Sequence, residues 1–217
     1  MAKPKYRFVC QSCGYTASKW MGRCPECGAW DSLVEEAEVS VKNSKSYLPV
    51  SSEKIKPRTI ASVAQTTVER LQTGIREFDR VLGGGIVPGS LVLLGGTPGI
   101  GKSTILLDAG LRFGQRGIKV LYVSGEESEE QTAMRAVRLG CRKENNSLLI
   151  MTATDLDAIL TQANAVSPQL LIIDSIQTMY NPELQTAAGS VGQVRECTAK
   201  LLQFAKTTGI AVMVIGH

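Results

Sequence analysis

The sequence predicts an α/β protein: a parallel β-sheet with helices on both faces, preceded by a small module rich in cysteine. From Leu91 onward, short apolar runs alternate with longer amphipathic segments. Unbroken apolar strands between helices are typical of a parallel sheet, which is buried on both faces. Two further observations support this division: closely spaced cysteine pairs near the N-terminus, and a glycine-rich turn directly after the first apolar strand of the core.

The composition sets the broad class of protein. The chain has 217 residues, of which 43% are hydrophobic, and a formal net charge of +4. No apolar run approaches the roughly 18 residues of a membrane-spanning helix, and the N-terminus lacks the apolar core of a signal peptide. We therefore expect no membrane association and a cytoplasmic location. The mild positive charge permits attraction to nucleic acid but does not by itself predict it.

The first expected unit, residues 1–34, carries two Cys-x-x-Cys pairs, formed by Cys10 with Cys13 and by Cys24 with Cys27. Zinc prefers four soft ligands at the corners of a tetrahedron, and each pair supplies two thiolates from one turn. Four protein ligands leave no open position for water, so we expect a structural zinc rather than a catalytic one. The alternative is a set of reduced thiols without metal.

Basic and aromatic residues lie among these cysteines: Lys19, Trp20, Arg23 and Trp30. Such a mixture could stack on nucleic-acid bases or bind a partner protein. The alternative is that Trp20 or Trp30 simply forms the small core of a module of this size.

Residues 35–58 mix serine, charged residues and two prolines, and we expect a linker there because the segment offers too little apolar surface for a core. The core then spans residues 59–217. Its expected strands are 91–96, 120–125, 147–151, 170–174 and 210–216, and its expected helices are 102–115, 129–139, 155–166 and 191–206.

The turn GGTPGIGKST contains the spacing G-x-x-x-x-G-K-S over residues 96–103, and it follows a strand and opens a helix as a phosphate-binding P-loop requires. Glycines let successive backbone amides point at phosphates, and the positive end of the helix assists them. Lys102 is expected to reach the β- and γ-phosphates, Ser103 to bind Mg²⁺, and Thr104 to lie near the α-phosphate. The expected nucleotide-binding residues are Gly96, Thr97, Pro98, Gly99, Ile100, Gly101, Lys102, Ser103 and Thr104. The alternative is a chance glycine-rich turn.

Acidic residues follow two other apolar strands. Asp174 ends the strand LLIID, at the edge where parallel α/β proteins bind ligands, and we expect it to hold the Mg²⁺ shell, with Ser175 extending the network. Glu126 and Glu127 follow the strand VLYVSG, and one of them could activate water. The alternative is that this pair only begins the next helix, which suits Glu127 better. His217 ends the last strand and could sense phosphates; the alternative is a histidine with only a structural role.

Taken together, these residues resemble the bacterial RadA family, also called Sms, a RecA-like recombination ATPase. The resemblance rests on VCQSCGYTASKWMGRCPECGAWDSL, RLQTGIREFDRVLGGGIVPGSLVLLGGTPGIGKST, YVSGEES and LLIIDSIQTMY. With these segments in the same order, the match to the family extends over essentially the whole chain. The P-loop region alone also resembles KaiC and the replicative helicase DnaB. The absence of an N-K-x-D motif in this chain disfavours a GTPase.

The resemblance implies a RecA-like P-loop ATPase core that forms a homo-hexameric ring, binds single-stranded DNA and promotes branch migration with the RecA recombinase. It places the catalytic carboxylate on Glu126, the magnesium ligand on Asp174 and the γ-phosphate sensor on His217. It also implies that residues 181–192 face the central channel as a candidate DNA contact. ATP, Mg²⁺ and Zn²⁺ are the implied cofactors.

The sequence stops at VMVIGH, whereas the family continues with a motif bearing lysine and arginine and with a Lon-protease-like domain. We therefore expect a fragment whose ATPase core is incomplete at its C-terminus. The leading hypothesis is an ATP-driven DNA motor that uses Lys102, Asp174 and Glu126 for hydrolysis. The alternative is a nucleotide-switched scaffold that recruits recombination proteins without translocation. The zinc module disfavours a KaiC-like signalling ATPase.

Overall fold

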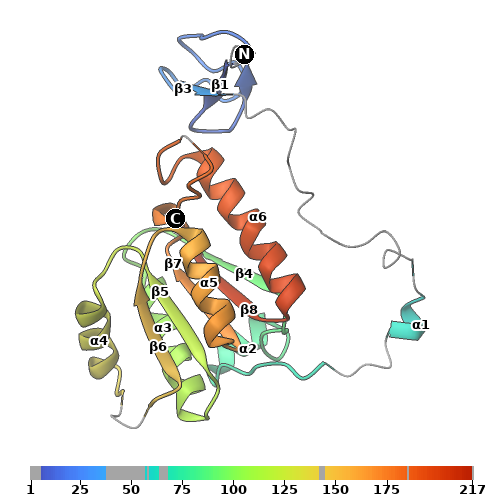
Figure 1. Ribbon diagram of the computed structural model, residues 1–217, viewed down its shortest axis with the longest axis vertical. Helices are drawn as coiled ribbons and strands as arrows, with labels where there is room; N and C mark the ends of the chain where they lie inside the picture. The colour runs from blue at the N-terminus through green and yellow to red at the C-terminus, as the bar shows by residue number, and fades with distance from the viewer. Residues whose placement is uncertain are drawn as a thin grey trace.

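The computed structural model describes residues 6–37, 57, 59–63, 68–141, 145–184 and 186–216. These residues form two separate sheets, one of three strands near the N-terminus and one of five parallel strands in the core (Figure 1). The predicted α/β class, with its parallel sheet, is therefore confirmed. No helix in the described ranges is long and apolar enough to cross a membrane.

The N-terminal module is a small antiparallel sheet. Its strands are β1 (Tyr6–Cys10), β2 (Thr16–Ala17) and β3 (Leu33–Ala37), in the order β2-β1-β3. Because β3 continues to Ala37, the regular structure extends three residues beyond the expected boundary at 34. Of the expected linker, residues 38–56 and 58 lie outside the described residues.

The core of this module is built around cysteines and not around tryptophan. Cys10, Cys24 and Leu33 are buried together. Trp20 and Trp30 are 57% and 72% exposed, so the interpretation of these two residues as the small core is wrong. The cysteine-centred packing leaves both large rings in solvent.

The larger sheet contains the strands β4 (Leu91–Gly95), β5 (Val120–Ser124), β6 (Leu148–Thr152), β7 (Leu170–Asp174) and β8 (Ala211–Gly216). Their order is β4-β8-β7-β5-β6, and every pairing is parallel. The main helices are α3 (Lys102–Gln115), α4 (Glu129–Arg138), α5 (Leu156–Val166) and α6 (Val191–Thr208). Shorter helical segments are α1 (Ile60–Val63), α2 (Arg76–Val81) and the 3-10 turn η3 (Ile176–Thr178). The expected strands and main helices are all present, with ends that shift by one or two residues.

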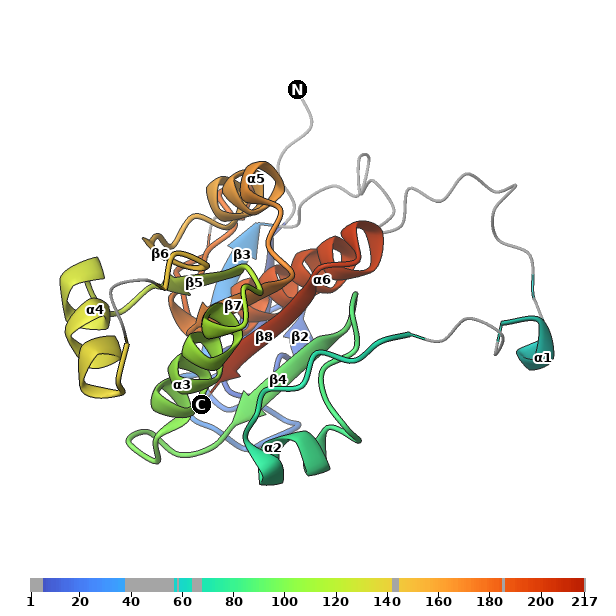
Figure 2. The same cartoon turned by 90° about the horizontal axis from the view of Figure 1, so that it is seen from below.

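Helices pack on both faces of this sheet, and each face has its own apolar cluster. Leu171 and Ile173 of β7 pack with α5 and α6, whereas Leu170 and Ile172 pack with α3. Figure 2 shows α3 and α6 on opposite sides of the strands. Alternating side chains of one strand thus enter two clusters, which explains the unbroken apolar sequence of the strand.

The parallel arrangement gathers the carboxyl ends of the strands at one edge. Gly95 of β4 pairs with Gly216 of β8, and Ser124 of β5 pairs with Asp174 of β7. Each of these strands continues into a loop at the same edge, which is where open α/β sheets bind ligands.

Candidate nucleotide site and zinc ribbon

The loop between β4 and α3, which the sequence predicts to be a phosphate cradle, is rich in glycines with positive φ. Gly99 and Gly101 have φ angles of +79° and +101°, which glycine adopts without steric cost. An added Cβ at either position would meet nothing within 4 Å, so these glycines border open space. Gly101 is the N-cap of α3, and the amides of the first helical turn therefore face the loop.

Lys102 folds back over this loop. Its Nζ donates hydrogen bonds to the carbonyl oxygens of Gly96 at 2.6 Å and Thr97 at 2.9 Å, and the residue is only 9% exposed. Ser103 is half-buried and Thr104 is exposed at the start of the same helix. The structure thus places one ammonium group against the cradle, with two hydroxyl side chains beside it.

Asp174, at the end of β7, is 7% exposed. Its Oδ2 accepts a hydrogen bond of 2.5 Å from the hydroxyl of Tyr122, which lies on the neighbouring strand β5 and is 1% exposed. Burial, followed by the negative charge of Asp174, raises the pKa of Tyr122 far above its usual range, so the tyrosine stays a neutral donor. The sequence analysis missed Tyr122, although its place two residues before the strand end puts it on the same face as Ser124.

The two glutamates after β5 have different surroundings. Glu126 is exposed, and its Oε1 accepts a 2.6 Å hydrogen bond from Ser175, the residue after Asp174. Glu127 forms an ion pair with Arg135 of α4. Burial acts to lower the pKa of Arg135, but this ion pair outweighs it and the pKa is raised. Of these two glutamates, Glu126 is the one whose side chain is bonded to the segment that follows Asp174.

Neither glutamate belongs to α4. The N-cap of α4 is Ser128, whose side chain forms a capping box with Gln131, and the acidic residues of the first turn are Glu129 and Glu130. The alternative interpretation of Glu126 and Glu127 as helix-starting charges is therefore wrong, because both precede the cap. Gly125 lets their segment approach η3 closely, since an added Cβ would collide with the side chain of Thr178.

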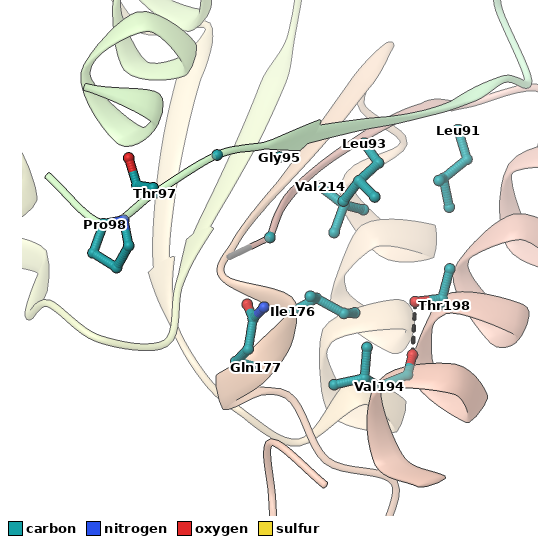
Figure 3. Close-up of a pocket in the computed structure, with 12 residues that line it drawn as sticks. Leu91, Leu93, Gly95, Thr97, Pro98, Ile176, Gln177, Val194, Thr198 and Val214 are labelled. Atoms are coloured by element: carbon teal, nitrogen blue, oxygen red, sulfur yellow. Dashed lines mark hydrogen bonds between the residues drawn. The ribbon is translucent and has the colours of Figure 1, made fainter. Parts of the chain in front are cut away.

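A pocket of about 600 Å³ lies beside the phosphate cradle (Figure 3). Figure 3 shows Thr97 and Pro98 at one end and Leu91 and Thr198 at the other. Its lining is Leu91, Leu93, Gly95, Gly96, Thr97, Pro98, Ile176, Gln177, Val194, Thr198, Val214 and Gly216. This lining is largely apolar, and it shares Gly96, Thr97 and Pro98 with the glycine-rich loop but does not include Lys102.

The segment after η3 is held by a polar network. Asn181 and Gln193 are both buried. The side-chain amide of Gln193 accepts a 2.7 Å hydrogen bond from the backbone N–H of Asn181 and donates a 3.3 Å hydrogen bond to the backbone carbonyl oxygen of the same residue. Lys200 of α6 donates to Asn181 and forms ion pairs with Asp157 and Glu183. The base of the expected channel loop, 181–192, is thus fixed to α5 and α6. His217, the expected phosphate sensor, lies outside the described residues.

The four cysteines of the N-terminal module converge as predicted. Their sulfur atoms all lie within 4.8 Å of one another, with 3.7 Å between Cys10 and Cys27 and 3.6 Å between Cys13 and Cys24. Thiolates bound to zinc at about 2.3 Å would stand roughly 3.8 Å apart at tetrahedral corners, so the arrangement fits zinc. A hydrogen bond with Ser32 lowers the pKa of Cys10 to about 6. The hydrogen bond with the Tyr15 backbone acts to lower the pKa of Cys13, but burial and hydrogen bonds with the neighbouring thiols outweigh it, so that this pKa is raised to about 12.

One exposed corner of the module combines charge with an aromatic ring. The guanidinium carbon of Arg23 lies 5.6 Å from the centroid of the Trp30 ring, and its Nε donates to the carbonyl oxygen of Gly28. The arginine is therefore anchored while the tryptophan remains accessible.

Comparison with known proteins gives concordant results. A protein-family model described as "AAA domain" matches residues 56–217, and one described as "Rubredoxin metal binding domain" matches residues 8–35. Curated proteins named "DNA repair protein RadA" are 50% identical in Halalkalibacterium halodurans and 48% identical in both Bacillus subtilis and Listeria monocytogenes. Each alignment covers 100% of this chain and 47% of the relative, so the chain spans about half the length of these relatives.

Proposed function

Because the chain belongs to the AAA domain family and resembles RadA DNA repair proteins over its whole length, we propose that it hydrolyses ATP to drive a DNA-processing step in repair and recombination. The observation that carries this proposal is the convergence of Lys102, Asp174 and Glu126 at one sheet edge. A cation, a buried carboxylate and an exposed carboxylate are the groups that phosphoryl transfer to water requires.

ATP binds with its phosphates against the backbone N–H groups of the loop around Gly99 and Gly101, and Lys102 exchanges its two loop carbonyls for oxygens of the β- and γ-phosphates. Thr104 faces the α-phosphate. Ser103 and Asp174 are the oxygen ligands suited to hold Mg²⁺, which neutralises phosphate charge when bound. The long, exposed cradle accommodates a triphosphate, because no side chain fills the space beside Gly99 and Gly101.

Glu126 is the general base. Its carboxylate accepts a proton from water as the water oxygen attacks the γ-phosphorus, and the bond from that phosphorus to the bridging oxygen breaks to release ADP and phosphate. The hydrogen bond from Ser175 to Oε1 holds Glu126 near Asp174, and within the described ranges Oε2 has no hydrogen-bond donor, so it can accept one from water. Glu127 is less suited to this role because its Oε2 is ion-paired with Arg135, which holds the side chain toward α4.

DNA is the proposed macromolecular partner. Only six residues separate Asp174 from the segment 181–192, and η3 lies between them, so a change at the nucleotide site reaches the proposed DNA-contact loop directly. The exposed rings of Trp20 and Trp30 offer a second stacking surface for single-stranded DNA. Branch migration together with RecA, assembly into a hexamer and phosphate sensing by His217 belong to the same proposal.

The test is ATP turnover with and without single-stranded DNA, measured in a chain extended to the length of the RadA relatives. A DNA motor turns over faster when DNA is added, and Lys102→Ala, the matched control, shows no turnover in either condition. Turnover without DNA stimulation would favour the nucleotide-switched scaffold. Absence of turnover under both conditions would overturn the ATPase proposal.

A further inference from the structure

We propose that Tyr122 is a positioning residue that orients Asp174 for Mg²⁺; this inference rests on the proposed nucleotide function. The two residues come from neighbouring strands, β5 and β7, and their side chains meet on the face of the sheet that packs against α3. That is the face from which the P-loop helix begins. The hydroxyl of Tyr122 is 2.5 Å from Oδ2 of Asp174.

Packing alone does not explain the hydroxyl of Tyr122, because the ring of a phenylalanine would fill the same space. Tyr122 is 1% exposed, and the other side chains of β5 up to Val123 are apolar. A buried hydroxyl is costly unless it has a partner, and phenylalanine would avoid that cost at the same volume. Here the partner is the carboxylate expected to hold the metal, which suggests that the hydroxyl serves the site.

The hydrogen bond from Tyr122 occupies one carboxylate oxygen of Asp174 and leaves the other oxygen available for a metal ion. Within the described part of the chain, Oδ2 of Asp174 has the tyrosine as its partner, and Oδ1 accepts no hydrogen bond. The terminal torsion of an aspartate is soft, so an untethered carboxylate can rotate. Mg²⁺ demands near-octahedral geometry, and a carboxylate whose plane is already fixed binds it at a smaller ordering cost.

A competing cation makes this tether more important. The guanidinium of Arg135 interacts electrostatically with both Tyr122 and Asp174, although its ion pair is with Glu127. Without the tyrosine hydroxyl, the carboxylate of Asp174 is free to turn toward Arg135. The hydrogen bond therefore holds the carboxylate of Asp174 in place against its electrostatic attraction to Arg135.

The test compares Tyr122→Phe with the unsubstituted chain in two conditions. The affinity for a fluorescent ATP analogue is measured first in EDTA and then across a Mg²⁺ titration. We expect the EDTA affinity to stay within about twofold, whereas the Mg²⁺ concentration for half-maximal tightening rises at least about tenfold, as is typical when the partner of a metal ligand is removed. Tyr180→Phe, the matched control, removes a hydroxyl that is not bonded to Asp174, and should change neither value.

The outcomes separate this inference from the proposed function. An unchanged Mg²⁺ titration for Tyr122→Phe would overturn the positioning role, while the unsubstituted chain still shows metal-dependent binding. An unsubstituted chain without such binding would overturn the proposed function and this inference together.

If Tyr122→Phe does not fold, the proposal can still be tested by NMR on the unsubstituted chain. The ¹³Cζ resonance of Tyr122 should shift when Mg²⁺ is added to the nucleotide complex, and that of Tyr180 should not. A Tyr122 resonance that stays in place would overturn the proposal.

Discussion

Replacing Glu126 by glutamine should stop chemistry while preserving binding. The amide oxygen of glutamine can still accept the hydrogen bond from Ser175, so the side chain keeps its place, but it cannot take a proton from water. Loss of a general base costs about two to four orders of magnitude in rate, which is roughly 3–5 kcal/mol in activation free energy.

The neighbouring substitution Glu127→Gln is the matched control. It removes a charge from the ion pair with Arg135, whose side chain is 17% exposed while that of Glu127 is 37% exposed. The cost of breaking a half-buried ion pair lies between that for a surface pair and that for a buried pair. We expect the free energy of unfolding to fall by about 1–3 kcal/mol. The expected result is a melting temperature lower by several degrees, with the rate of hydrolysis little changed.

The assay combines binding of a fluorescent ATP analogue, thermal melting and single-turnover phosphate release, the last in a chain of the length of the RadA relatives. Glu126→Gln should bind nucleotide with near-normal affinity and release phosphate at least about a hundredfold more slowly. An inverted result, with Glu127→Gln inactive and Glu126→Gln nearly normal, would refute the assignment of the base. It would leave the P-loop assignment intact.

Three other substitutions test separate parts of the molecule. Lys102→Ala should abolish tight ATP binding with little change in melting temperature, because its hydrogen bonds lie within the exposed loop; calorimetric titration checks this, and normal affinity would contradict it. Cys24→Ser should lower the zinc content from one atom per chain toward zero in elemental analysis, whereas unchanged metal content would show that this thiol is not a ligand. Gly125→Ala should lower stability by about 1–3 kcal/mol in denaturant unfolding, since its Cβ has no room beside Thr178, and an unaffected midpoint would show that η3 yields easily.

Sequence alone predicted the features that are local in the chain. A P-loop is made of consecutive residues, so the spacing from Gly96 to Thr104 already contains the turn, the cation and the helix start. The cysteine pairs are local in the same sense, and their convergence follows from two repeated turns. The strands and helices of the core were predictable because continuous apolar runs and helical periodicity distinguish them.

The order of the strands was not readable from these patterns, because apolar strands such as β5, β7 and β8 carry nearly the same composition. The exposure of Trp20 and Trp30 was equally open, since the same residues would suit a core or a surface. In both cases, the tertiary packing decided between alternatives of similar local chemistry.

Sequence by itself therefore determined which chemical groups this protein possesses, and the tertiary structure alone decided which of them meet. Strand pairing brings Tyr122 to Asp174 across 52 positions and Ser175 to Glu126 across 49. Glu126 and Glu127 are adjacent and chemically identical, and they differ only because one contacts Ser175 and the other Arg135. Such differences depend on distances between remote segments, which arise only when β5 and β7 pair in register and α4 packs beside them.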